Sequence, residues 1–107
     1  MTTPRVVVRP AAVRDIDDQA DYLSQRSEQL ADRFLEAVDR TIQDVARMPG
    51  IGASYPLTNP RLQGLRSWPV SGFKQHLIFY LINDDGITVV RVLHGARDVQ
   101  SILESQT

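Results

Sequence analysis

The chain of 107 residues contains no cysteine, so neither a disulfide framework nor a thiolate metal site can form. No apolar run approaches the roughly 20 residues that a membrane-spanning helix needs. Residues 1–10 also lack the apolar stretch and cleavage site of a signal peptide. We therefore expect a soluble, cytoplasmic protein without a membrane partner. A chain of this size buries roughly 60–70% of its unfolded surface, which predicts one domain over residues 1–107.

Several motifs that carry catalysis are missing as well. No Gly-x-Ser-x-Gly sequence is present, which argues against a serine hydrolase. Gly50-Ile51-Gly52 precedes no Lys-Ser/Thr and opens no helix, so it does not form a phosphate-binding loop. The only two histidines, His76 and His94, lack the ligand spacing of a metal site, apart from Asp98 four residues after His94. We predict no metal and no cofactor.

Charge is balanced in total but uneven along the chain. Residues 10–48 hold nine acidic and five basic side chains, whereas residues 61–97 hold five basic and two acidic ones. A basic second half is consistent with an acidic or polyanionic partner, and equally with a solvated charged surface. Direct nucleic-acid binding stays open.

The first half of the sequence predicts one strand and two helices. The β-branched run Arg5–Arg9 is typical of a strand that ends before Pro10. Apolar residues then recur at helical spacing from Ala11 to about Gln25. A second amphipathic helix follows Ser27, whose hydroxyl can cap it, and continues to Pro49-Gly50. The short link between the two helices predicts an antiparallel hairpin.

The second half predicts strands. Prolines and glycines make 49–63 an irregular surface connection. Strands are expected over Leu65–Val70, Phe73–Ile82 and Ile87–Leu93, with a hairpin turn at 83–86, and Asp98 can cap a short final helix. The predicted fold class is α+β, two-layer, with the order β-α-α-β-β-β, a short C-terminal helix, and the helical hairpin packed on a small antiparallel sheet. We expect the other face of the sheet to be open.

Polar residues gather where the strand Ile87–Leu93 ends: Arg91, His94, Arg97 and Asp98. Together with Arg66 and Lys74 they can hold a phosphodiester, and His94 can move a proton near neutral pH. The same residues also have structural explanations, since Arg91 can pair with an acidic residue of the fold and Asp98 can cap the last helix. Trp68 can stack on a base or pack in a core or interface.

Several segments, in order, resemble one protein family over about residues 5–103. They are the helix pair, the Pro-Gly break at 49–50, Gly64-Leu65-Arg66-Ser67, the run His76–Tyr80, and Arg91-Val92-Leu93-His94-Gly95-Ala96-Arg97-Asp98. The chain resembles the RelE/ParE superfamily of bacterial toxins from type II toxin–antitoxin pairs, and the closing octet is similar to the ParE branch. The resemblance implies a hetero-oligomer with a cognate ParD-like antitoxin, which wraps a segment around the helix pair and sheet.

The two branches of this superfamily imply different activities. ParE toxins act on DNA gyrase without a catalytic centre, arrest growth and stabilise plasmids or chromosomes. RelE toxins cut messenger RNA on the ribosome. By this resemblance Arg97 matches a RelE arginine, Lys74 lies near another basic position, and Arg66 lies near the lysine-bearing strand, where a lysine pair is reduced to one basic residue. His94 would match the histidine of a His-Tyr member. Leu103 stands about where the RelE tyrosine would be, and Gly95 replaces the tyrosine of a His-Tyr pair.

These departures favour a ParE-like gyrase inhibitor that is not an enzyme. The binding residues we expect are Arg66, Trp68, Lys74, Arg91, His94, Arg97 and Asp98. The alternatives are a ribosome-dependent mRNA endonuclease, or a member without toxicity that acts only in an antitoxin complex. In each case we expect apolar surface on the free protein that awaits a partner.

Overall fold

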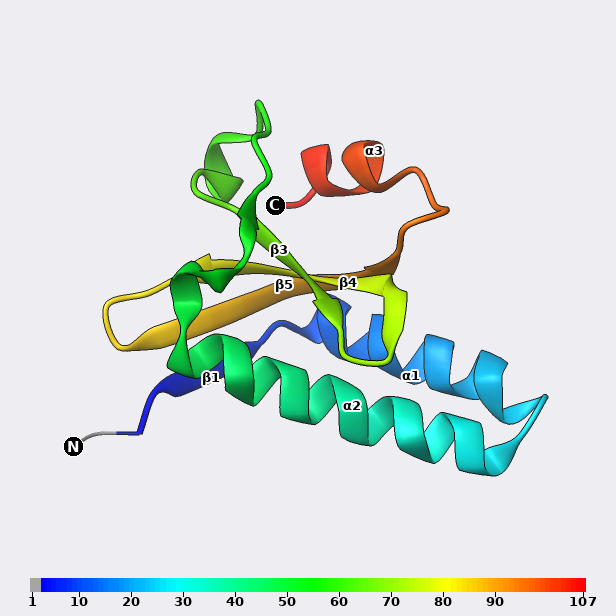
Figure 1. Cartoon of the computed structure of the whole chain (residues 1–107). Coiled ribbons are helices and arrows are strands. Elements are labelled where there is room, and N and C mark those ends of the chain that lie inside the picture. The colour runs from blue at the N-terminus through cyan, green and yellow to red at the C-terminus, as the bar shows by residue number, and fades with distance from the viewer. Residues whose placement is uncertain (1–2) are drawn as a thin grey trace.

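Figure 1 shows the computed structural model, which describes residues 3–107, so the first two residues of the predicted domain lie outside it. The helices and strands follow in this order: β1 (Arg5–Val8), α1 (Pro10–Ser24), α2 (Glu28–Arg47), the 3-10 turn η1 (Pro49–Ile51), β2 (Ala53–Ser54), the 3-10 turn η2 (Pro60–Leu62), β3 (Arg66–Val70), β4 (Phe73–Ile82), β5 (Gly86–His94) and α3 (Val99–Glu104).

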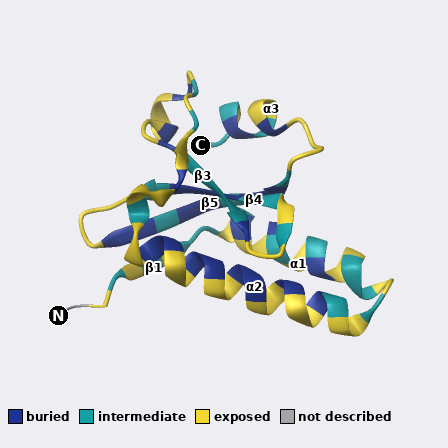
Figure 2. Cartoon of the chain, in the orientation of Figure 1, coloured by how far each residue is buried: buried dark blue, intermediate teal, exposed yellow. Residues whose placement is uncertain are grey.

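The predicted helical hairpin is confirmed. Pro10 occupies the first turn of α1, where its missing N–H costs no hydrogen bond. Ser27 caps α2, because its Oγ accepts a hydrogen bond from the Leu30 N–H at 3.2 Å. The apolar stripe of α2, with Phe34 and Val45 fully buried, faces the sheet (Figure 2). Packing of this stripe, rather than helix propensity, holds the hairpin on the sheet.

The five strands form one sheet in the order β1-β5-β4-β3-β2. The α+β class is confirmed, and strands β3, β4 and β5 pair antiparallel as expected. β2 also pairs antiparallel, with β3. β1 differs, since it runs parallel to β5 at the sheet edge. A parallel pair requires a long connection, and here it includes the helical hairpin and strands β2, β3 and β4. β2, two residues long, was not predicted, because it lies within the segment that appeared irregular.

Two apolar cores lie on opposite faces of the sheet. The first lies between the helical hairpin and the sheet and includes Phe34, Ile78 and Val92. The second includes Leu62, Leu65, Phe79, Val90, Leu93, Val99 and Leu103. The expectation of an open second face is therefore wrong: the segment before β3 and α3 pack on it, above the sheet in Figure 1.

Hydrogen bonds tie this segment to α3. Glu104 accepts from the Thr58 and Asn59 N–H groups at 3.1 and 2.8 Å. The Asn59 side chain donates to the carbonyl of Leu103 at 3.0 Å. The cover over the second face is thus one connected unit, although its parts lie more than 40 residues apart in sequence.

Candidate functional site

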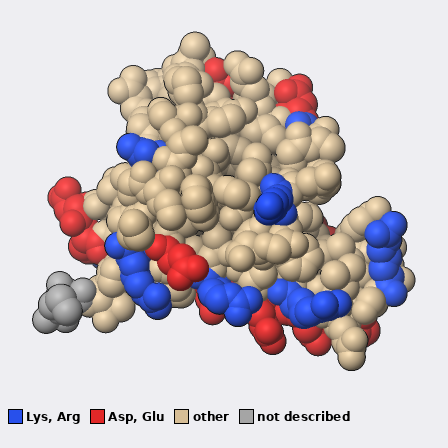
Figure 3. Space-filling view, in the orientation of Figure 1, with Lys and Arg blue, Asp and Glu red and all other residues tan. Residues whose placement is uncertain are grey.

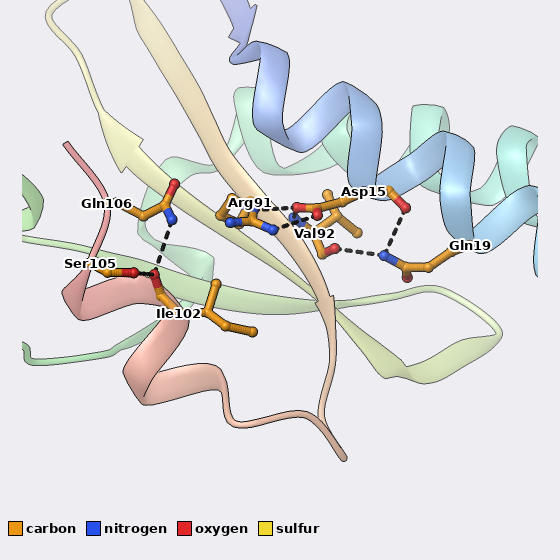
Figure 4. A network of polar contacts seen from close by, with 7 residues as sticks. All are labelled: Asp15, Gln19, Arg91, Val92, Ile102, Ser105 and Gln106. Carbon is orange, nitrogen blue, oxygen red and sulfur yellow. Dashed lines mark hydrogen bonds and ion pairs between the residues drawn. The ribbon is translucent and has the colours of Figure 1, made fainter.

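α1 lies beside the C-terminal half of β5, beyond the end of β1. β1 ends at Val8, opposite Val89, whereas β5 continues to His94. Past that point two side chains of α1 replace a strand partner (Figure 4): Asp15 Oδ2 accepts from the Val92 N–H at 3.1 Å, and Gln19 Nε2 donates to the Val92 carbonyl at 2.7 Å. Side chains of a helix thereby satisfy the Val92 N–H and carbonyl groups at the open edge of β5.

Arg91 is held in the same network. Its Nε and Nη2 donate to the two carboxylate oxygens of Asp15 at 2.6 and 2.7 Å. The side chains of Arg91 and Asp15 are only 15% and 7% exposed. These hydrogen bonds raise the pKa of Arg91 above its ordinary value, against the effect of burial. The sequence allowed Arg91 either to bind a ligand or to pair with an acidic residue of the fold, and in the structure it pairs with Asp15.

The two histidines face each other across β4 and β5. His76 is the register partner of His94, and their ring centroids lie 5.0 Å apart in an edge-to-face arrangement. Gln19 Oε1 lies 2.5 Å from His76 Nδ1, which links the pair to the α1 network. Burial lowers the pKa of His76, and the neighbouring His94 adds to this shift.

This histidine pair opens on a cavity of about 540 Å³ between the second half of α1 and the ends of β4 and β5. Its lining also includes Asp18, Tyr22, Leu23, Arg26 and Gln75. A smaller pocket of about 280 Å³ shares Gln75 and His94 and is bordered by Lys74, Gly95 and Ala96. The smaller pocket is therefore bordered by two of the predicted binding residues, Lys74 and His94.

The remaining predicted residues lie elsewhere. Arg66 donates to the Gly52 carbonyl at 2.6 Å and pairs in register with Tyr80. Tyr80 lies four positions along β4 from His76, which corresponds to about 13 Å at 3.3 Å per residue. Trp68 is half-buried and packs against the first core.

The turn after β5 carries the last two predicted residues. Arg97 is exposed, as is Asp98, whose carboxylate caps α3 by accepting from the Ser101 N–H at 3.3 Å. The capping role was one of the two interpretations from the sequence. The expected site residues did not include Asp15, Gln19 or His76. The sequence does carry a signal for two of them, because helical spacing places Asp15 and Gln19 beside the apolar stripe of Ala12, Ile16 and Ala20.

The uneven charge of the sequence does not produce a one-sign surface on the face drawn in Figure 3, where Lys and Arg alternate with Asp and Glu along the helices at the lower edge. Within residues 3–107, no group of three or more His, Cys, Asp or Glu side chains is arranged to hold a metal ion. None of the described helices combines the length and the apolar composition that crossing a membrane requires.

A second hollow lies on the helical side, between α1, α2 and β1. It has a volume of about 250 Å³ and is lined by Val8, Val13, Ile16, Leu35, Val38 and Ile42, with Asp17 and Asp39 beside them. Val13 and Leu35 are 44% and 39% exposed, which is high for apolar side chains. We call this the hairpin groove.

Comparisons with known proteins agree with this architecture. The model of the family described as "ParE toxin of type II toxin-antitoxin system, parDE" matches residues 6–99. No curated protein sequence matches the chain. Among solved structures, the fold is similar to a chain of the "Chromosomal ParDE TA system from P. aeruginosa", with a TM-score of 0.67 and 15% sequence identity, over 86% of this chain and 96% of that one.

Proposed function

The chain belongs to the ParE toxin family of type II toxin–antitoxin systems, and on this premise we propose that it inhibits DNA gyrase and is neutralised by a cognate ParD-like antitoxin. The observation that supports binding over catalysis is the separation of the candidate nuclease residues. Arg66 is engaged by Gly52 at one end of the sheet, while Lys74 and His94 lie at the other.

A supercoiling assay with the purified chain and gyrase tests the target. We expect loss of supercoiling and accumulation of cleaved DNA as the chain is added. No inhibition at saturating chain, together with cleavage of ribosome-bound message, would contradict the proposal.

The endonuclease alternative keeps one supporting observation, which is that Lys74 and His94 border the same pocket. If it holds, replacing His94 and Arg97 by Ala leaves ribosome-bound message intact. If it fails, the double variant and the wild type treat message alike and growth arrest persists. A chain that affects neither gyrase nor message but still binds its antitoxin would be a member without toxicity.

For the antitoxin we propose the hairpin groove. Its apolar lining calls for a segment with regularly spaced apolar side chains, since exposed patches of this kind mark interaction sites. Asp17 and Asp39 at the groove favour basic residues beside them in the antitoxin. The adjacent β1 is also an edge strand, and the N–H groups of Arg5 and Arg9 point toward β5. By strand alternation, Val6 and Val8 present their backbone groups outward, where an extended segment can add to the sheet.

Charge placed in the hairpin groove tests this surface. We expect the double variant Val13→Asp and Leu35→Asp to lose co-purification with the antitoxin, while gyrase inhibition by the free chain persists. Met48→Asp is the matched control, because Met48 is 64% exposed and lies outside the groove. Retention of the antitoxin by the double variant, or its loss in the control, would assign the antitoxin to another surface.

A further inference from the structure

The histidine pair has hydrogen-bonding capacity that the fold does not use. Among the described residues, no fully buried side-chain nitrogen or oxygen lacks a partner. The hydrogen bonds of His76 and His94 to the rest of the protein are made through Nδ1 in both rings. Their Nε2 atoms are therefore accessible, in side chains that both line the cavity beside α1.

The tautomer of His76 follows from Gln19. The Gln19 Nε2 donates to two carbonyls, of Asp15 at 2.9 Å and of Val92 at 2.7 Å, which fixes the orientation of the amide. Its Oε1 therefore faces His76 Nδ1 and can only accept a hydrogen bond. Neutral His76 must carry its proton on Nδ1, and its Nε2 presents a lone pair.

The tautomer of His94 is the opposite one. Its Nδ1 accepts the Ala96 N–H at 3.0 Å, so the proton of the neutral ring lies on Nε2. The two rings that line this cavity thus carry one free acceptor, on His76, and one free donor, on His94, and their centroids lie 5.0 Å apart.

We propose that this pair binds a carboxamide, whose N–H donates to His76 Nε2 and whose carbonyl accepts from His94 Nε2–H. A metal ion bridging the two Nε2 atoms would need a lone pair on both, which conflicts with the bond from Ala96 to His94. A carboxylate has no donor for His76. Leu23 and Tyr22 line the same cavity and offer apolar surface to the stem of a ligand. The carboxamide can belong to an Asn or Gln side chain of a protein partner or to its backbone, and the inference does not depend on the proposed function.

Nuclear magnetic resonance of the full chain, labelled with ¹⁵N in histidine, tests both steps. Without ligand, the long-range ¹H–¹⁵N spectrum at neutral pH should give the Nδ1–H tautomer for His76 and the Nε2–H tautomer for His94. Propionamide should then shift the signals of both rings saturably, whereas isosteric propionate should not. N-methylacetamide, which mimics the backbone, separates the two sources: tighter binding of propionamide identifies a side-chain amide, and the reverse order identifies a backbone amide.

The variant Gln19→Leu removes the acceptor that fixes His76, and we expect at least fivefold weaker propionamide binding. Gln43→Leu on the exposed side of α2 is the matched control and should bind as the wild type does. If Gln19→Leu does not fold, the tautomers and the propionamide titration of the wild type still decide the question. The same tautomer in both rings, or equal shifts with propionate and propionamide, would overturn the inference.

Discussion

Removing the Asp15 carboxylate should destabilise the protein more than removing any other acidic side chain of α1. In Asp15→Ala, the Arg91 guanidinium loses both of its hydrogen bonds to Asp15, and the Val92 N–H loses its acceptor. The guanidinium cannot escape by losing its proton, because the pKa of an arginine lies far above neutrality.

The magnitude follows from burial. Breaking a buried ion pair by removing one partner costs about 3–5 kcal/mol. Arg91 retains 15% exposure, so we expect the lower end of this range. The Val92 N–H adds a cost of about 1 kcal/mol that partly overlaps with the first. The total of about 3–4 kcal/mol is a large part of the 5–15 kcal/mol by which domains are stable. With an unfolding entropy of about 2.1 cal/mol/K per residue over 107 residues, a loss of 3 kcal/mol lowers Tm by about 13 °C.

Urea unfolding followed by the fluorescence of the single tryptophan, Trp68, measures this loss. Asp18→Ala is the matched control, because Asp18 is exposed on the same helix and should change stability by less than about 0.5 kcal/mol. The double variant Asp15→Ala with Arg91→Met removes both charges and should be more stable than Asp15→Ala alone. A loss below about 1 kcal/mol in Asp15→Ala, or no recovery in the double variant, would refute the assignment of this pair as a structural ion pair.

Three further perturbations probe other parts of the fold. Burial, with the neighbouring imidazole, lowers the pKa of His76 below its ordinary value of 6.5, so the unfolded chain binds a proton more readily. The free energy of unfolding should therefore fall as pH drops below about 6.5. The fall should be smaller in His76→Gln, and urea unfolding midpoints at several pH values measure the difference. Glu104→Ala removes the acceptor for the Thr58 N–H, and hydrogen exchange at that amide should quicken while exchange in α2 does not. Gly86→Ala would place a Cβ 1.8 Å from a carbonyl oxygen of β1, so thermal unfolding should show a loss of stability of at least about 1–3 kcal/mol. The control Gly50→Ala has open space around the new Cβ and should be nearly neutral.

The elements that the sequence predicts well are those with local signals. Ser27 and Asp98 are found as helix caps because a short polar side chain before an apolar period suits the free N–H groups there. β4 runs over Phe73–Ile82 as predicted, since it is long, largely apolar and bounded by turn residues on both sides.

The second face of the sheet could not be predicted in the same way. Prolines and glycines made the connection before β3 look like a surface loop, although Leu62 and Leu65 are each only 1% exposed. The core that buries them includes Val99 and Leu103 of α3, and α3 is tied through Glu104 to Thr58, 46 residues away in sequence. Local composition carries no information on a contact of that range, and the leucines alone do not indicate which element covers them.

The histidine pair depends on one irregularity that the hairpin turn does not encode. Near the turn Ile82 pairs with Ile87, and continuing that register would place Leu93 opposite His76. A bulge at Val90 adds one residue to β5, so that His94 pairs with His76 instead. A shift of one residue exchanges the two faces of a strand, so the bulge turns His94 toward the same side of the sheet as His76. The bulge also lies directly before Arg91 and Val92, both of which donate hydrogen bonds to Asp15. Sheet register, helix contact and candidate ligand site therefore originate from one inserted residue, which explains why the composition of the closing octet suggested a site but not its geometry.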